Sequence, residues 1–236
     1  MPEGYEPLQG RQRAVVAVFA LIVLVDLVAV WSSIAELNLV DRIESGALVE
    51  DSEIDANDAR QGSMGLVQLA LYIAGAVVFI RWLRAAYRNA DVVAPGLRRY
   101  GHGWAIGGWF VPILAAWRPK QILNDVWRAG SASPSADERP PVLLLAWWLS
   151  WLAGTLLSQA AGRAGVSQDS LDELRTVDIL YIVSDSWDAV VALMAVAVVL
   201  HITRRLEGKA AAGGAPQPEA PPATQWLTPE RPAAAE

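Results

Sequence analysis

Four apolar runs, each long enough to cross a bilayer as a helix, constrain this chain more than any other feature. A bilayer core about 30 Å thick requires about 20 mostly apolar residues per helix. The runs that meet this requirement are residues 14–34, 64–83, 142–160 and 177–202. Backbone polar groups find no water inside the bilayer, so each run is expected to be helical. The sequence therefore predicts an all-α fold, an integral membrane four-helix bundle.

Composition agrees with this fold and excludes several kinds of site. Apolar residues make up 53% of the 236 residues and 11 residues are tryptophan, which is unusual for a soluble protein. The absence of cysteine excludes disulfides, thiolate metal ligands and a cysteine nucleophile. The chain has two histidines and lacks the zinc-protease, hydrolase-elbow and phosphate-loop motifs. We therefore expect no enzymatic activity and no bound metal or cofactor.

The first apolar run admits two interpretations. Arg11 and Arg13 precede it, and Ser33-Ile34-Ala35 loosely fits a cleavage site, as in a signal peptide. However, the run is longer than the roughly 7–15 apolar residues of a signal peptide. We interpret it as an uncleaved spanning helix.

Charged residues separate between the two ends of the predicted bundle. Residues 35–63 contain eight acids and two arginines, whereas Lys and Arg gather before the first run, between the second and third, and after the fourth. Cytoplasmic flanks collect Lys and Arg. We therefore predict a protein of the bacterial cytoplasmic membrane with both termini in the cytoplasm and an acidic loop, 35–63, outside. This charge distribution also argues against nucleic-acid binding.

Both ends of the chain are predicted to lie outside the folded domain, which comprises residues 11–206. Residues 1–10 are expected to be disordered. Residues 207–236 are dominated by Pro, Ala and Gly, a composition that cannot build a packed core, so a disordered cytoplasmic tail is expected. Within that tail, Trp226 and Leu227 are a candidate motif for a partner.

An interfacial block is predicted at residues 101–129 on the cytoplasmic side. Residues 101–117 are apolar but short, and they contain four glycines and Pro112, so they are expected to dip into the membrane or to lie on it. Residues 120–129 predict an amphipathic helix in the membrane plane. The predicted lipid contacts are Arg81, Arg84, Arg88, Trp104, Trp109, Trp117 and Trp127.

Acidic residues inside two apolar runs form the candidate site. In the fourth run, Asp178, Tyr181, Asp185 and Asp188 are spaced three and four residues apart and so share one helix face. An acid at mid-membrane costs about 2.5–3.5 kcal/mol on the insertion scale, so this face should point into the bundle. At a rise of about 1.5 Å per residue, Asp26 in the first run lies at about the same depth in the membrane as Asp185 and Asp188. We predict an intramembrane polar cluster of Asp26, Asp185, Asp188, Ser150 and Tyr181.

Three hypotheses fit this cluster at the level of sequence. The acids can stabilise the bundle by hydrogen bonds to neighbouring hydroxyl, indole and backbone groups. Alternatively, they can relay protons, or they can provide oxygen ligands for a hard cation.

Small residues on the third run predict a close contact between helices. Gly154, Ser158 and Gly162 are spaced four residues apart, which places them on one face and permits two helices to approach closely. We expect this contact within the bundle rather than between two copies of the chain.

Three segments carry a family resemblance: RWLRAAYRN (81–89), RYGHGWAIGGWFVPILAAWRPKQILNDVWRAG (99–130) and VSDSWDAVVALMAVAVVLHITRR (183–205). The chain resembles the bacterial, mostly actinobacterial, membrane family known as domain of unknown function 4328, over about residues 65–206. The most specific match is Gly103, Trp104, Gly108, Trp109, Phe110 and Pro112, together with the acid pair Asp185 and Asp188. Members often have Tyr in place of Ala85 and a shorter first loop. The resemblance implies a membrane-embedded fold and no particular activity.

We expect a structural or interaction role for this membrane protein. Its expected partners are the lipid bilayer and other membrane or cytoplasmic proteins, through the interfacial block and the tail. The alternative is a small proton- or cation-coupled transporter or channel component that uses Asp26, Asp185 and Asp188.

Overall fold

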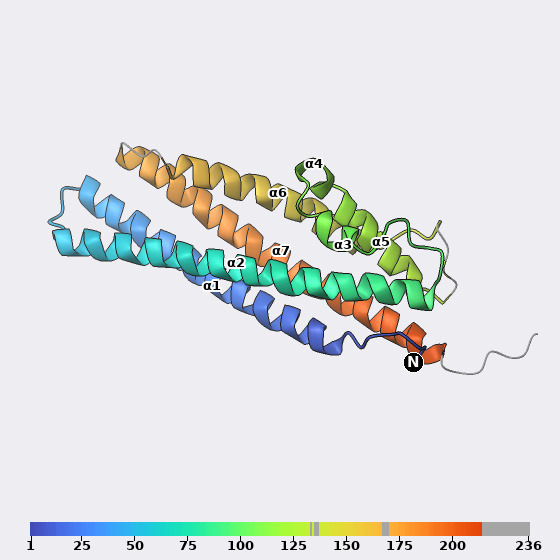
Figure 1. Cartoon of the computed structure of the whole chain (residues 1–236). Helices are drawn as coiled ribbons and strands as arrows, with labels where there is room; N and C mark the ends of the chain where they lie inside the picture. Colours follow the sequence, from blue (N-terminus) through green and yellow to red (C-terminus); the bar gives the residue numbers. More distant parts are fainter. Residues whose placement is uncertain (133, 135–136, 167–169, 214–236) are drawn as a thin grey trace, which may run out of the picture.

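A computed structural model describes residues 1–132, 134, 137–166 and 170–213. In this part of the chain all regular structure is helical, and no residue lies in a strand. The helices are α1 (Gln9–Glu44), α2 (Asp51–Val93), α3 (Trp104–Gly107), α4 (Pro112–Ala115), α5 (Arg118–Ala129), α6 (Val142–Ala164) and α7 (Leu171–Ala212). The prediction of an all-α four-helix bundle is confirmed (Figure 1).

Four of these helices are long and apolar enough to cross a membrane: α1, α2, α6 and α7. The chain is therefore a multi-pass membrane protein. Helix α1 packs along α7 and α2, while α6 packs on α7. The short helices α3–α5 lie together at one end of the bundle, near the N-terminus and the last turns of α7 (Figure 1).

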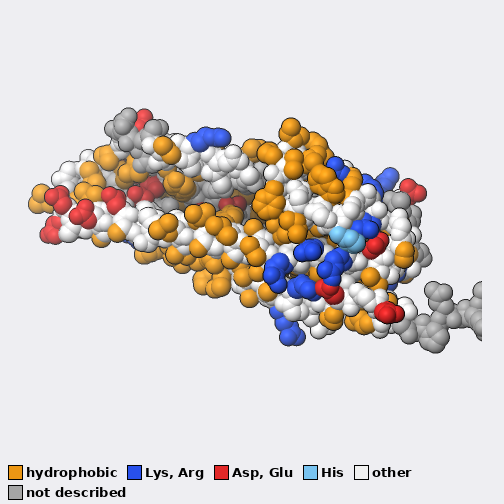
Figure 2. Space-filling view, in the orientation of Figure 1, with side chains coloured by type: hydrophobic (Ala, Val, Ile, Leu, Met, Phe, Trp, Pro, Cys, Tyr) orange, Lys and Arg blue, Asp and Glu red, His pale blue; other side chains and the backbone are white. Residues whose placement is uncertain are grey.

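The two ends of the bundle differ in charge. Acidic side chains gather at the end that holds the α1–α2 connection, and Lys and Arg gather at the end that holds α3–α5 (Figure 2). We call these the acidic end and the basic end. Both termini of the described chain lie at the basic end (Figure 1).

The acidic segment 35–63, predicted as a loop, is mostly helical. Helix α1 continues to Glu44 and α2 begins at Asp51, so only residues 45–50 connect them. Gly46 has a φ of +76°, a left-handed conformation that glycine adopts without steric cost. The acids lie mostly on exposed helical turns, where water solvates them, and arginines pair with some of them. Arg42 pairs with Glu53 at 2.7 Å, and Arg175 pairs with Glu44 at 2.8 Å.

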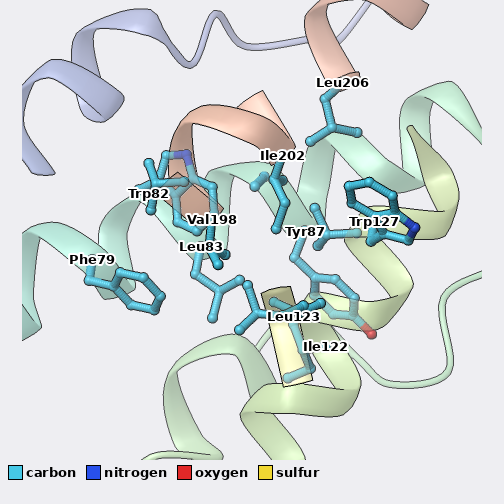
Figure 3. Close-up of a cluster of buried hydrophobic side chains, with 14 of the residues drawn as sticks. Phe79, Trp82, Leu83, Tyr87, Ile122, Leu123, Trp127, Val198, Ile202 and Leu206 are labelled. Atoms are coloured by element: carbon cyan, nitrogen blue, oxygen red, sulfur yellow. The ribbon is translucent and has the colours of Figure 1, made fainter. Parts of the chain in front are cut away.

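A dense apolar core lies at the basic end, where α2, α5 and α7 meet (Figure 3). Trp82 is fully buried, and its indole N–H donates to the Thr203 hydroxyl at 3.0 Å. The other large side chains of this core are Phe79, Leu83, Tyr87, Ile122, Leu123, Trp127, Val198, Ile202 and Leu206. This core extends beyond the ends of the apolar runs, so protein rather than lipid surrounds it.

Helix α5 is amphipathic, but its apolar face does not point to lipid as predicted. Ile122, Leu123 and Val126 are fully buried against α2 and α7. The prediction failed because α2 and α7 extend past their apolar runs and offer a protein surface that the sequence pattern did not show. Burying each of these side chains stabilises the fold by about 1.5–3 kcal/mol.

The segment before α5 forms two single-turn helices at the surface of the basic end. Pro112 begins α4. A backbone N–H in the first turn has no hydrogen-bond partner within the helix, so proline loses none there. A Cβ at Gly108 would lie 2.8 Å from the carbonyl oxygen of Trp104, so only glycine fits that turn. Phe110 and Ile113 are each 72% exposed, which leaves an apolar surface at this end.

The N-terminal residues, predicted to be disordered, pack against the basic end. Leu8 is fully buried, and Tyr5 is nearly so. The Glu6 backbone N–H donates to Asn89 Oδ1 at 2.9 Å, and the Glu6 carboxylate pairs with Arg88. The Leu8 backbone N–H donates to Glu207 Oε1 at 3.1 Å. Two apolar side chains and these polar contacts hold the segment in place.

The C-terminal boundary also differs from the prediction. Helix α7 continues to Ala212, past the expected domain end at residue 206. Residues 214–236, including Trp226 and Leu227, lie outside the described residues.

Candidate functional site

A groove opens on the side of the bundle between α2 and α6. It encloses about 670 Å³, and its floor is formed by α7. Figure 2 shows the hollow between these helices, with an acidic side chain visible inside it. The groove exists because α6 packs on α7 while α2 packs mainly on α1, so the two helices diverge. Small side chains, among them Ala76, Ala192 and Ala195, leave the space open.

Aromatic rings close the groove at its end nearest α3–α5. Phe79 lies 5.8 Å from Trp109 and 5.6 Å from Trp147, measured between ring centroids. Trp109 is edge-on to Trp151 at 5.5 Å. All four rings line the groove. Edge-to-face pairs of this kind are favourable beyond the area that they bury.

Polar side chains occupy the other half of the groove. The Tyr72 hydroxyl donates to Asp188 Oδ2 at 2.5 Å, and the Ser158 hydroxyl donates to the same oxygen at 3.1 Å. The Ser158 and Ser184 hydroxyls are 2.9 Å apart. Asp188 of α7 is therefore bonded to both walls, α2 and α6.

One amide connects the other two acids. The Gln68 side-chain nitrogen donates to Asp185 Oδ1 at 3.1 Å and to Asp26 Oδ1 at 3.3 Å. Asp26 is 1% exposed, and its Oδ2 has no hydrogen-bond partner among the described residues. Asp185 and Asp188 of α7 thus line the groove, and Asp26 of α1 is buried next to it, bonded through Gln68.

Two residues predicted for this cluster have other positions. Ser150 contributes its backbone carbonyl, which accepts a hydrogen bond from the Trp187 indole N–H at 2.9 Å. Tyr181 lines the groove, but its hydroxyl lies against Gly165, where a Cβ would be 2.5 Å away.

Asp178, placed by spacing on the same helix face, belongs to a separate polar cluster nearer the acidic end. It is fully buried and lies beside Glu36. The Asn57 amide donates to Glu36 Oε1 at 2.9 Å, and Gln61 also donates to Glu36. Arg60 donates to the Ser32 hydroxyl at 2.9 Å. These contacts tie α1, α2 and α7 together.

Sequence reasoning missed Gln68 and Tyr72, which supply the donors from α2. The signal was present: Gln68, Tyr72 and Phe79 lie four and seven residues apart, which places them on one helix face. Because neither side chain is charged at neutral pH, they did not stand out from an otherwise apolar run.

The predicted small-residue contact is formed in part. A Cβ at Gly154 would lie 2.9 Å from Asp188 Oδ1 and 3.0 Å from a Trp187 ring carbon, so α6 and α7 touch there. Ser158 follows one turn later, as described above. Gly162 departs from the prediction, since it is exposed and nothing lies within 4 Å of its Cβ position. The buried Ala161 takes its place.

The residues predicted to contact lipid divide into two groups. Arg81, Arg84, Trp104 and Trp117 have exposed side chains at the basic end. The others are engaged within the protein. Arg88 pairs with Glu6, Trp109 belongs to the aromatic end of the groove, and Trp127 stacks on His201 at 4.8 Å with the Arg205 guanidinium 4.0 Å from its ring centroid.

No group of three or more His, Cys, Asp or Glu side chains within the described ranges is placed to hold a metal ion.

Four spanning helices around a polar-and-apolar groove define a helical integral membrane protein. The family model described as Domain of unknown function (DUF4328) matches residues 45–204, which is more than half of the chain. The protein belongs to this family. The match includes Gln68, Tyr72, Ser158, Asp185 and Asp188 but not α1 with Asp26. Comparison with curated proteins and with solved structures finds no match.

Proposed function

We propose that this protein has a non-enzymatic binding role, in which its groove takes up a small molecule dissolved in the membrane. The observation that carries the proposal is the groove of about 670 Å³. Ligand sites enclose about 300–1,000 Å³ and combine mostly apolar walls with a few polar groups. The walls here are mostly apolar, and their polar groups include the hydrogen-bonded Tyr72, Gln68, Asp185 and Asp188.

The cellular setting forms part of the same proposal. We place the protein in the bacterial cytoplasmic membrane, with the basic end and both termini in the cytoplasm. The clustering of Lys and Arg at one end of the bundle supports this orientation. The exposed Phe110, Ile113 and Trp117 then lie at the inner membrane surface, at the same end of the bundle as the exposed Arg81 and Arg84. Aromatic and basic side chains are typical of that level, where lipid headgroups or a protein partner would contact them.

The binding role is tested by filling the groove from one of its walls. Ala76 is exposed and lines the groove, whereas the adjacent Val77 is exposed but does not line it. We therefore compare Ala76→Phe with the matched variant Val77→Phe in neutral phosphatidylcholine nanodiscs. The probes are 11-bromoundecylamine, 11-bromoundecanol and 11-bromoundecanoate, whose bromine quenches tryptophan fluorescence on contact. Trp109, Trp147 and Trp151 line the groove and report occupancy.

At least one probe should quench the natural protein and Val77→Phe equally, and should quench Ala76→Phe less. If Ala76→Phe and Val77→Phe are quenched alike by all three probes, the groove does not bind amphiphiles and the proposal is wrong. Thr155→Phe, which lines the groove on α6, and Leu156→Phe, which does not, repeat the comparison from the opposite wall.

Proton- or cation-coupled transport is the second candidate function. It is favoured by the buried Asp26 Oδ2, which has no partner in the described structure and would accept a proton or face a cation. The test is proton and Na⁺ flux in liposomes that contain the protein or the triple variant Asp26→Asn, Asp185→Asn, Asp188→Asn. Flux that is identical with and without the three acids would eliminate this function.

A further inference from the structure

We propose that the ligand of the groove is a cationic amphiphile, a lipophilic amine whose ammonium group is bound by Asp185 and Asp188 while its apolar chain extends to the aromatic end. This inference rests on the proposed binding role. It adds the charge, the orientation and the entry route of the ligand.

The charge follows from the groups at the groove, where Asp185 and Asp188 line the wall and Asp26 is buried next to it. Asp26, Asp185 and Asp188 are carboxyl groups, and their hydrogen-bond donors Gln68, Tyr72 and Ser158 are all neutral. Within the described ranges, every ion pair of the chain involves other acids, at the ends of the bundle. A carboxyl group removed from water is either protonated or paired with a positive charge, and no residue in the described part of the chain supplies that charge here. A cationic ligand supplies it.

The hydrogen-bonding capacity of the acids points to a donor-rich group. A carboxylate offers about four acceptor positions, and Asp185 Oδ1 uses one for Gln68 while Asp188 Oδ2 accepts from Tyr72 and Ser158. The remaining acceptors need donors. A primary ammonium has three donors and no acceptor, so it suits two carboxylates on one helix face better than an alcohol does.

Asp26 provides a second, independent indication. Its carboxyl is almost entirely removed from solvent, yet Oδ2 has no partner among the described residues. Its Oδ1 shares the Gln68 amide with Asp185, so the unpartnered acid stands directly behind the ammonium position. A buried acid left in this state is stabilised when positive charge enters the groove.

The orientation follows from the separation of polar and aromatic groups along α7. Ala192 and Ala195 continue the floor beyond Asp188, which places Ala195 about 10 Å further along the helix. Phe79, Trp109, Trp147 and Trp151 enclose that region. An alkyl or aryl chain with its ammonium at the acids therefore ends among the rings.

The entry route is lateral, from the bilayer. Leu69 and Tyr72 line the groove and are 58% and 45% exposed, so its mouth opens on the side of the spanning bundle between α2 and α6. A molecule already dissolved among the acyl chains reaches the acids without crossing an aqueous opening. This route favours an amphiphile over a small hydrated cation.

The headgroup series of bromoundecyl probes tests the charge. After subtraction of the quenching that remains in Ala76→Phe, the amine should bind the natural protein about 10- to 100-fold more tightly than the alcohol, the range that a charge-assisted hydrogen bond provides. The carboxylate should bind more weakly than the alcohol because the acids repel it. This comparison uses the natural protein and so does not depend on a variant that folds.

The variants Asp185→Asn and Asp188→Asn should remove the advantage of the amine, so that amine and alcohol bind each variant within about twofold of each other. Asp58→Asn, on an exposed turn of α2, is the matched control and should alter neither. Equal groove-dependent binding of amine and alcohol would overturn the cationic inference while leaving the binding role intact. If no probe shows groove-dependent quenching, the binding role itself fails.

Discussion

At the scale of single residues, Gln68 determines the arrangement of the candidate site. One side-chain amide nitrogen serves two acids on two different helices, Asp26 on α1 and Asp185 on α7. Without it, both carboxyl groups would lose a hydrogen-bond donor within the spanning part of the bundle. Leaving a buried polar group unpaired costs about 1–3 kcal/mol.

We expect Gln68→Leu to lower the free energy of unfolding by about 1–3 kcal/mol, because it removes the donor and keeps a similar side-chain volume. The control is Leu66→Ala on the lipid-facing side of the same helix, which is 70% exposed and should change stability by about 0.5 kcal/mol or less. Both values are measured by denaturant titration in bicelles. An effect of Gln68→Leu no larger than the control would show that the amide does not hold the acids.

Outside the membrane, His102 provides a prediction about pH. Slight desolvation and the neighbouring Arg98 guanidinium lower the pKa of His102, although its side chain is exposed. The unfolded chain, with an ordinary pKa of about 6.5, then binds more protons than the folded chain in mildly acidic solution. The contribution of His102 to stability is therefore complete above a pH of about 6.5. It declines as the pH falls toward and through the lower pKa of the folded state.

NMR titration of the imidazole protons should give His102 a pKa below about 6.5. His201, the only other histidine, is assigned with a His201→Gln variant. Replacing Arg98 with Gln should raise the pKa of His102. A value at or above the ordinary one in the natural protein would contradict the predicted direction.

At the scale of helices, the contact between α6 and α7 depends on one glycine. Ala at Gly154 would place its Cβ 2.9 Å from Asp188 Oδ1 and 3.0 Å from Trp187, so these side chains or the two helices must shift. Ala at Gly162 meets nothing within 4 Å. We expect Gly154→Ala to destabilise the protein by about 1–3 kcal/mol, as overpacking does. Gly162→Ala should be neutral or slightly stabilising, since it improves helix propensity.

Thermal unfolding of the two alanine variants in one detergent measures this difference. Equal effects would show that α6 and α7 do not approach each other at Gly154.

The position of α5 gives a second prediction at this scale. Leu123 is fully buried between α5 and the long helices, whereas Ile113 on α4 is 72% exposed. Leu123→Ala should therefore cost about 2–5 kcal/mol, and Ile113→Ala about 0.5 kcal/mol or less. The measurement is the midpoint of urea unfolding followed by circular dichroism. If α5 instead lay on the membrane surface, the two substitutions would have similar effects.

The four spanning helices were predictable because an apolar run of bilayer length has few alternatives to a helix. Their ends were not, since α1 and α2 continue through charged, exposed turns such as those of Arg42 and Glu53, and hydrophobicity does not mark where such turns end. Apolar periodicity in α5 identified the buried face correctly, but it does not reveal whether lipid or protein covers that face. In the groove, the charged residues were found by their cost in a membrane, whereas Gln68 and Tyr72 carry no comparable signal.

At the scale of the whole molecule, the separation of charge between the two ends makes the orientation testable. The chain has no cysteine, so single-cysteine variants report position without background. Leu48→Cys, in the α1–α2 connection, should react with an impermeant maleimide added to intact cells. His102→Cys, at the exposed surface of the basic end, should react only after the cells are permeabilised. If His102→Cys reacted in intact cells and Leu48→Cys did not, the orientation would be the reverse of the one proposed.

The protein has two packed layers. The bilayer surrounds the spanning helices, whereas water surrounds the core around Trp82, Tyr87 and Leu206. Helices α2 and α7 pass from one into the other without a break. Urea reaches the layer outside the lipid directly, whereas the bilayer shields the spanning layer. Unfolding by urea should therefore begin at the basic end and continue along α2 and α7 into the spanning layer. The aromatic end of the groove would loosen before the hydrogen bonds of the acids break.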